Sequence, residues 1–249
     1  MAEETSCSTG GKLAARLLDE LAKATQDPPG ITRAAYGPGE RFAHGLMRAE
    51  AEKLGAVARS DAAGNLYLTL AGRTSDLPQI VIGSHLDSVP HGGNFDGAAG
   101  VAAGLAVLAE FVGQGLVPPR DITVLATRAE EAAWFPLSYP GSLAALGRLP
   151  PEALDARRSD SGRSLADHMR EEGFDADAVR RGVPGIAVKD IAAFLEVHIE
   201  QGPRLLAAGQ PVGIVTGIAG GFRHVAARCL GNYGHSGAEP RFARRDAVL

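Results

Sequence analysis

Apolar residues recur along the chain at helical spacing in three places, and each recurrence predicts a helix. Residues 13–21 carry leucines at this spacing, and residues 39–54 place their apolar side chains on one side. A further helix, rich in small residues, is predicted over 97–111. Farther along, Ser164 and Asp167 have the spacing of a capping box and predict the start of a shorter helix.

Four other segments have the pattern of strands. Residues 65–70 alternate between apolar and polar positions, as a half-buried strand does. Residues 79–83, 122–127 and 194–199 contain apolar runs typical of strands that are buried on both faces. Because these strands alternate with helices, the sequence predicts an α/β fold with a mostly parallel central sheet and flanking helices.

The pattern changes after Gln210, where residues 212–215 and 222–230 predict longer β segments between glycine-rich turns. We therefore expect a domain boundary there, with a first domain over 1–210 and the beginning of a smaller domain over 211–249. The chain stops in what resembles the first turns of a helix. This ending predicts a C-terminally truncated piece of a longer protein.

Composition narrows the class of protein. The 249 residues are 45% hydrophobic and 22% charged, which is ordinary for a globular protein and excludes a disordered or fibrous one. The net charge of -4 offers no basic surface for nucleic acid. The longest apolar stretch, near 97–113, is interrupted by Glu110 and is too polar to cross a membrane. Cys7 and Cys229 are too far apart in the sequence to suggest a disulfide framework. No secretory signal is visible at the N-terminus, which predicts a cytoplasmic protein.

A first group of polar residues follows the predicted strand 79–83. His85 and Asp87 come directly after it, and Asp96 stands at the start of the next helix. Ligands bind at the carboxyl ends of strands in open α/β sheets, and imidazole and carboxylate groups are the ligands that zinc takes. Asp87 can orient the His85 ring. The alternative is that both aspartates only cap a turn and a helix.

A second group, Glu130 and Glu131, follows the predicted strand 122–127. One of two adjacent carboxylates can bind a metal ion while the other acts as a general base. The alternative is an acidic helix start, which the helix dipole favours.

The third group lies on the predicted strand 194–199 and just beyond it. With a period of two residues, Glu196, His198 and Glu200 share one face. A metal-lined pocket and a solvated sheet face both explain such a polar face. His235 lies in a loop of small residues, from which it can reach a ligand.

Together these groups resemble the amidase branch of the two-zinc aminoacylase and carboxypeptidase family. That branch includes N-carbamoyl-L-amino acid hydrolases, allantoate amidohydrolases and β-ureidopropionases. The motifs that carry the resemblance are Gly83–Gly97, Glu130-Glu131, Leu195–Pro203, His235-Ser-Gly and Arg244–Ala247. The run His198-Ile-Glu-Gln-Gly-Pro203 points to this branch rather than to the peptidases.

The resemblance implies a role for each matching residue. The metal ligands are His85, Asp96, Glu131 and His198; Glu130 and Asp87 are catalytic; and Gln201 and His235 bind substrate. Asp96 bridges two divalent ions, which are zinc or else manganese, cobalt or nickel. Glu130 is the general base, and Asp87 orients His85.

The resemblance also implies a fold and an activity. The fold is a zinc-exopeptidase-like catalytic domain with a smaller α+β lid and dimerisation domain, in a homodimer when full length. The activity is hydrolysis of linear amide or ureido C–N bonds in small molecules, with N-carbamoyl-L-amino acids as expected substrates. Allantoate hydrolysis, an aminoacylase or dipeptidase activity, and an inactive truncated remnant are the alternatives. We expect the 249-residue fragment itself to be inactive, with no nucleic-acid or membrane partner.

Ala129 departs from the family, which often has Asp at that position.

Overall fold

The computed structural model describes residues 8–218, 220, 227–235 and 237–247. It divides into two compact units, one within residues 1–201 and the other within 202–249. Each unit is described by itself. The domain boundary near Gln210 stays a prediction.

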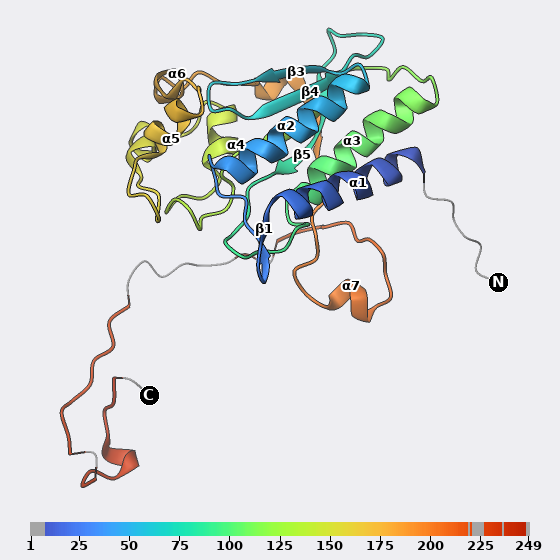
Figure 1. Cartoon of the computed structure of the whole chain (residues 1–249). Helices are drawn as coiled ribbons and strands as arrows, with labels where there is room; N and C mark the ends of the chain where they lie inside the picture. Colours follow the sequence, from blue (N-terminus) through green and yellow to red (C-terminus); the bar gives the residue numbers. More distant parts are fainter. Residues whose placement is uncertain (1–7, 219, 221–226, 236, 248–249) are drawn as a thin grey trace. The chain divides into compact units, whose positions relative to one another are not determined.

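A five-stranded sheet forms the centre of the first unit (Figure 1). Its strands are β3 (Val57–Ser60), β4 (Leu66–Leu70), β5 (Gln79–His85), β6 (Ile122–Thr127) and β7 (Ile191–Leu195), in the order β3-β4-β6-β5-β7. β5 pairs in parallel with both β6 and β7, whereas β4 is antiparallel to β6 and β3 is antiparallel to β4. The α/β class is therefore confirmed, with a mixed sheet. The pairing of β3 with β4 is antiparallel because a short turn joins the two strands.

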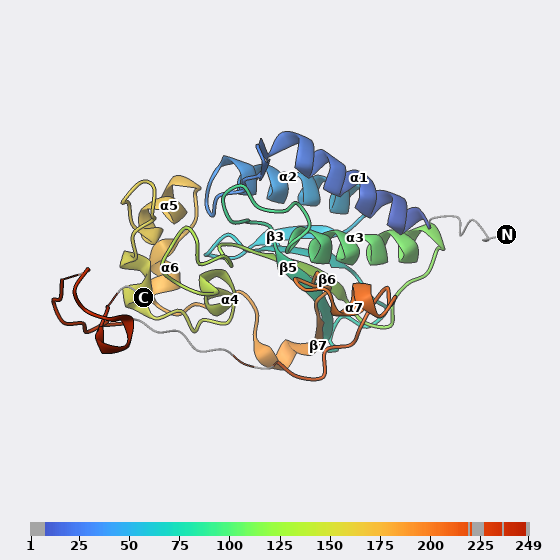
Figure 2. The same cartoon turned by 90° about the horizontal axis from the view of Figure 1, so that it is seen from below.

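Three long helices cover one face of this sheet (Figure 2). They are α1 (Thr9–Ala24), α2 (Pro38–Lys53) and α3 (Ala98–Gly113), and they confirm the three helices predicted from apolar spacing. Their apolar sides and the sheet form the main core, which includes Leu17, Leu21, Met47, Leu105, Leu108, Leu68 and Val124. The opposite face carries a smaller core of Tyr67, Val81, Leu125 and Ile186.

The segment between β6 and β7 is built from short helices around an apolar core of its own. They are α4 (Pro140–Ala145), η1 (Pro151–Asp155), α5 (Leu165–Glu171), α6 (Ala176–Arg180) and η2 (Val188–Asp190). Ser164 caps α5 in a reciprocal capping box with Asp167, as predicted. Trp134 and Phe135 lie buried in this core, a few residues after the Glu130-Glu131 pair. A small ribbon of β1 (Gln26–Asp27) and β2 (Gly30–Ile31) precedes α2.

The strand predicted over 194–199 lies elsewhere than expected. β7 begins at Ile191, and its pairing with β5 ends where Leu195 faces Ile82. Glu196, His198 and Glu200 lie beyond the strand, so the prediction that they share one strand face is wrong. Just beyond the strand, the Ser84 hydroxyl donates to the Glu196 carboxylate over 2.5 Å.

The second unit contains α7 (Arg204–Ala207) and η3 (Arg241–Ala243). The strand predicted over 212–215 is wrong. Val212, Ile214 and Val215 are exposed, and no strand of the described residues pairs with this segment. Of the strand predicted over 222–230, residues 222–226 lie outside the described residues, and 227–230 are not in a strand. No helix in the described ranges is both long and apolar enough to cross a membrane.

Candidate metal centre

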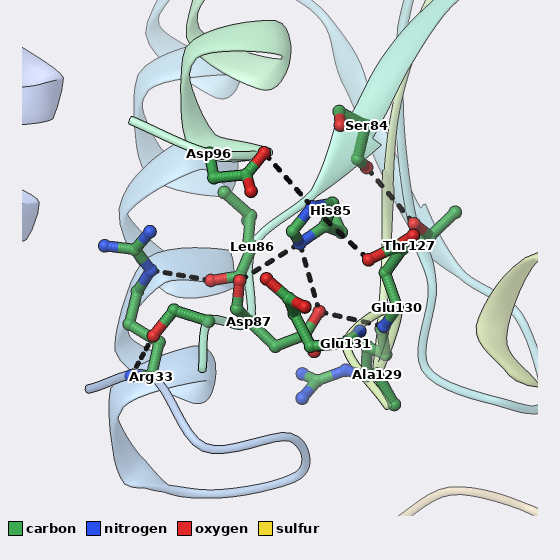
Figure 3. Close-up of polar contacts among 12 residues, drawn as sticks. Arg33, Ser84, His85, Leu86, Asp87, Asp96, Thr127, Ala129, Glu130 and Glu131 are labelled. Carbon is green, nitrogen blue, oxygen red and sulfur yellow. Dashed lines mark hydrogen bonds and ion pairs between the residues drawn. The ribbon is translucent and has the colours of Figure 1, made fainter. Parts of the chain in front are cut away.

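The parallel half of the sheet places the predicted ligands at one edge. His85 is the last residue of β5, Glu130 and Glu131 follow β6, and His198 follows β7. Parallel strands present their carboxyl ends at a common edge, where ligands bind in such folds. Ligand atoms of His85, Glu130 and Glu131 lie within 4.8 Å of one another (Figure 3).

The buried His85 ring is held with its Nε2 atom toward the acidic residues. Its Nδ1 atom lies 3.0 Å from the Asp87 carbonyl oxygen and 3.4 Å from Oδ1 of Asp87. Its Nε2 atom lies 3.7 Å from Oε2 of Glu130. When Nδ1 is engaged in this way, Nε2 is the nitrogen left to bind a metal ion.

The charge around His85 is strongly negative. Burial lowers the pKa of His85, but the hydrogen bond and charge of Asp87, together with Glu130 and Glu131, raise it to about 9. Burial also raises the pKa of both glutamates; the neighbouring carboxylates add to this, and His85 opposes it. Carboxylates crowded in this way favour a positive charge among them.

Asp96 connects the β5 end to His198. Its Oδ1 atom is buried without a hydrogen-bond partner, 4.0 Å from Nε2 of His85 and 3.8 Å from Nε2 of His198. Its Oδ2 atom accepts a hydrogen bond from the Gln201 side chain over 2.7 Å. A buried carboxylate oxygen without a partner calls for a physical explanation, and a cation bound between the two imidazoles supplies one.

Gly97 allows His85 and Asp96 to come this close. Its φ angle is +64°, in the left-handed region, and it caps α3 directly after Asp96. A Cβ atom at this position would lie 2.5 Å from the His85 carbonyl oxygen and 2.6 Å from the imidazole ring. Only glycine fits both the angle and the space.

Asp87 fixes the Glu130-Glu131 segment through the backbone. One carboxylate oxygen of Asp87 accepts the N–H of Glu130 and the other accepts the N–H of Glu131, each over 3.0 Å. Asp87 is fully buried, so these charge-assisted bonds are shielded from water. The residue predicted to orient His85 thus also positions both glutamates.

A buried ion pair holds the same segment from its other side, and the sequence analysis missed it. The Glu40 carboxylate accepts hydrogen bonds from the Arg128 guanidinium over 2.7 Å and from the N–H of Ala129 over 3.1 Å. Ala129 has a φ of +54°, which is costly for alanine. An available signal was the position of Arg128 directly after a buried strand, where a cation needs an acidic partner.

The remaining predicted site residues are less closely gathered. The His198 side chain is about half exposed, and its Nδ1 atom lies 2.7 Å from the Ile199 carbonyl oxygen. His235 lies in the second unit, where its Nδ1 atom accepts the N–H of Gly237. The substrate-binding roles of Gln201 and His235 stay predictions.

The residues present fit a divalent metal ion. His85, His198, Asp96 and Glu131 offer two imidazoles and two carboxylates beside the Glu130 carboxylate, and such nitrogen and oxygen ligands suit zinc and related ions. The unpartnered oxygen of Asp96 lies among them. The α/β fold and this cluster together form a candidate metal centre at the carboxyl ends of parallel strands.

Comparisons with known proteins show what the chain is similar to. Residues 65–147 match the model of peptidase family M28. The chain is 41% identical to an N-carbamoyl-L-amino acid amidohydrolase of Geobacillus stearothermophilus, over 96% of the chain and 58% of that protein. It is 35% identical to an allantoate amidohydrolase of Bacillus subtilis, over 88% of the chain and 52% of that protein.

Structure comparison agrees with these relatives. A hydantoinase/carbamoylase family amidase from Burkholderia ambifaria matches with a TM-score of 0.78 and 31% identity, over 94% of the chain and 57% of that structure. The predicted resemblance to the amidase branch is therefore confirmed. The chain spans somewhat more than half the length of the curated relatives it matches.

Proposed function

We propose that the chain carries the metal centre of an amidohydrolase that cleaves the ureido group of N-carbamoyl-L-amino acids. The observation that carries the proposal is the buried, unpartnered Oδ1 atom of Asp96 between the imidazoles of His85 and His198. The 41% identical relative named for this activity supports the choice of substrate.

In this proposal the ligands divide between two ions. His85, Asp96 and His198 would hold one ion, and Asp96 with Glu131 would hold the other. The chemistry that such ions supply is polarisation of the substrate carbonyl and a lowered pKa of bound water. Zinc as the metal, a homodimeric assembly and a cytoplasmic location belong to the same proposal.

Glu130 acts as the general base. It takes a proton from the attacking water and delivers it to the leaving nitrogen as the C–N bond breaks. Hydrolysis of the ureido group in this way yields the free amino acid, carbon dioxide and ammonia.

The backbone hydrogen bonds to Asp87 support this assignment of roles. They fix the start of both glutamate side chains, so that Glu130 and Glu131 are held side by side. Catalysis by a positioned base depends on such fixed geometry.

Allantoate is the second candidate substrate, favoured by the 35% identical relative from Bacillus subtilis. Allantoate also carries ureido groups, so the same centre and the same base serve both reactions. The two substrates differ in the groups next to the reacting carbon, which only a substrate comparison can separate.

The test is a substrate comparison on metal-reconstituted protein. The protein is stripped with a chelator, reloaded separately with zinc, manganese, cobalt or nickel, and assayed with N-carbamoyl-L-amino acids, allantoate and N-acetyl amino acids. If the gene encodes a longer polypeptide, the assay uses that polypeptide. We expect metal-dependent ammonia release from N-carbamoyl-L-amino acids. Faster ammonia release from allantoate would favour the second candidate, and amine release from N-acetyl substrates alone would contradict both.

A further inference from the structure

Arg33 is a buried cation whose hydrogen bonds all go to neutral oxygens. Its side chain has no exposed surface. The guanidinium donates to the Leu86 carbonyl over 2.7 Å, to the Asn94 side-chain oxygen over 3.0 Å and to the Asn94 carbonyl over 3.2 Å. Among the described residues, no carboxylate accepts a hydrogen bond from this guanidinium.

These acceptors lie at the two ends of one loop. Leu86 directly follows His85, and Asn94 precedes Asp96 by two residues. The guanidinium therefore spans the gap between the segment that carries His85 and the segment that carries Asp96. Figure 3 shows Arg33 beside this loop, with its bond to the Leu86 carbonyl.

The backbone of Arg33 adds a third attachment in the middle of the loop. Its N–H donates to the Ser88 hydroxyl, and its carbonyl accepts the N–H of Ser88, each over 2.9 Å. Asn94 is itself anchored to α1, because its side chain donates to the Leu18 carbonyl over 2.8 Å. The loop between the two predicted ligands is thus fastened at residues 86, 88 and 94.

A buried arginine at this position lowers the stability of the fold unless its charge or the shape of its guanidinium group makes specific interactions. Burial disfavours a charged guanidinium, and a well-packed apolar side chain of similar volume is often at least as stable. Burial lowers the pKa of Arg33 to about 10, although Asp87, Asp96 and Glu40 oppose the shift. The planar fork of arginine can reach two separate backbone segments at once, which lysine and apolar residues cannot do.

We infer that Arg33 is a positioning residue that sets the separation between His85 and Asp96, and thereby the geometry of the metal centre. The inference rests on the proposed function. A direct role in substrate binding is disfavoured because the side chain is fully buried and each of its three nitrogens already donates a hydrogen bond.

The test uses Co²⁺ as the probe, because its visible absorption reports the geometry of its ligands. The 249-residue chain is titrated with Co²⁺ as wild type, Arg33→Met and Arg33→Lys. Changes to groups that orient metal ligands typically weaken metal binding by 10–100-fold. In Arg33→Met we expect a loss of Co²⁺ affinity of about this size, together with an altered spectrum. In Arg33→Lys, which keeps the charge but lacks the planar guanidinium, we expect about a tenfold loss of affinity.

Arg158→Met is the matched control. Arg158 is also buried; it donates to the Ala35 carbonyl, pairs with Asp160 and lies over the Trp134 ring, and it has no direct bond to the 86–96 loop, which Trp134 contacts through the Ser88 carbonyl. We expect this variant to lose thermal stability but to keep the wild-type affinity for Co²⁺ and its spectrum. An equal loss of affinity in Arg158→Met would overturn the inference, because general destabilisation would then explain the effect.

The outcomes separate this inference from the proposed function. Wild-type affinity and spectrum in Arg33→Met would overturn the positioning role alone. If Arg33→Met does not fold, Arg33→Lys is the deciding variant. Full Co²⁺ affinity in Arg33→Lys would show that the positive charge suffices, and would overturn the role of the guanidinium as a bridge between the two segments. A wild-type chain that binds no Co²⁺ would overturn the proposed metal centre and the inference with it.

Discussion

The guanidinium of Arg128 lies 2.7 Å from the carboxylate of Glu40, and both side chains are almost completely buried. This ion pair joins the start of α2 to the residue that follows β6. Through Arg128 and Ala129 it supports the segment that carries the two glutamates of the metal centre.

Breaking this pair should be strongly destabilising. In Glu40→Gln the Arg128 cation stays buried without an anionic partner, and such a change costs about 3–5 kcal/mol. We expect the free energy of unfolding, measured by urea denaturation, to fall by this amount. The control is Glu171→Gln, which removes the exposed pair of Arg163 and Glu171 and should cost less than about 1 kcal/mol. Equal losses in the two variants would contradict the importance of burial.

The two adjacent glutamates should respond differently to the same substitution. Glu130→Gln is expected to lower kcat by about 10²–10⁴-fold with normal metal content, because Glu130 is the proposed base. Glu131→Gln is expected to lose metal, because Glu131 is a proposed ligand. Metal analysis of the purified variants, together with ammonia release, checks both expectations. Metal loss in Glu130→Gln with full occupancy in Glu131→Gln would reverse the two roles.

Adding one methyl group at Gly97 should disrupt the centre. In Gly97→Ala the new Cβ atom collides with His85 and the backbone must hold a positive φ, so His85 and Asp96 are forced apart. We expect a loss of metal affinity of at least tenfold and a lower melting temperature. Gly113→Ala, at the other end of α3, is the matched control, since a Cβ atom there meets nothing within 4 Å. Alanine should be neutral or stabilising at that position.

His44 should make the fold sensitive to acid. Burial and the nearby Arg128 and Arg48 cations lower the pKa of His44 well below its ordinary value of 6.5, and both ring nitrogens lack a hydrogen-bond partner. The unfolded chain therefore binds the proton more readily than the folded chain. The stability that depends on neutral His44 is present above pH 6.5 and is lost as the pH falls below it.

In His44→Leu this contribution disappears. The free energy of unfolding should fall less steeply below pH 6.5 than in the wild type, by up to about 1.4 kcal/mol per pH unit. Urea denaturation between pH 5 and 8 measures the slopes, and the exposed His91 provides a control as His91→Leu. Identical slopes in wild type and His44→Leu would contradict the expectation.

The sequence predicted the interior of the sheet better than its edges. The central strand β6 has the predicted bounds, because a strand buried on both faces has a continuous apolar run. β3 was missed because its residues are largely exposed, and it forms by pairing with β4. The position of β7 depends on where β5 is available for pairing, which the local pattern of 194–199 does not contain.

The same limit applies to the candidate site. His85, Glu130 and Glu131 were placed together because each follows a strand of the parallel set. Arg33 and Glu40 were not identified, because Leu86, which accepts from Arg33, and Arg128, which pairs with Glu40, lie 53 and 88 residues away along the chain. A single sequence shows that such charges exist, but not which distant groups they meet.

The edge position of β7 predicts a mechanical role for an ion bound at the proposed metal centre. β7 is bonded only to β5 among the described strands, and most of its residues are exposed. His198 lies just beyond it. An ion shared by His198, His85 and Asp96 would therefore cross-link the end of this strand to the rest of the sheet. In the metal-free chain, the amide hydrogens of β7 should exchange with solvent before those of β5 and β6. Metal uptake would then slow exchange first at the strand that the hydrophobic core holds least.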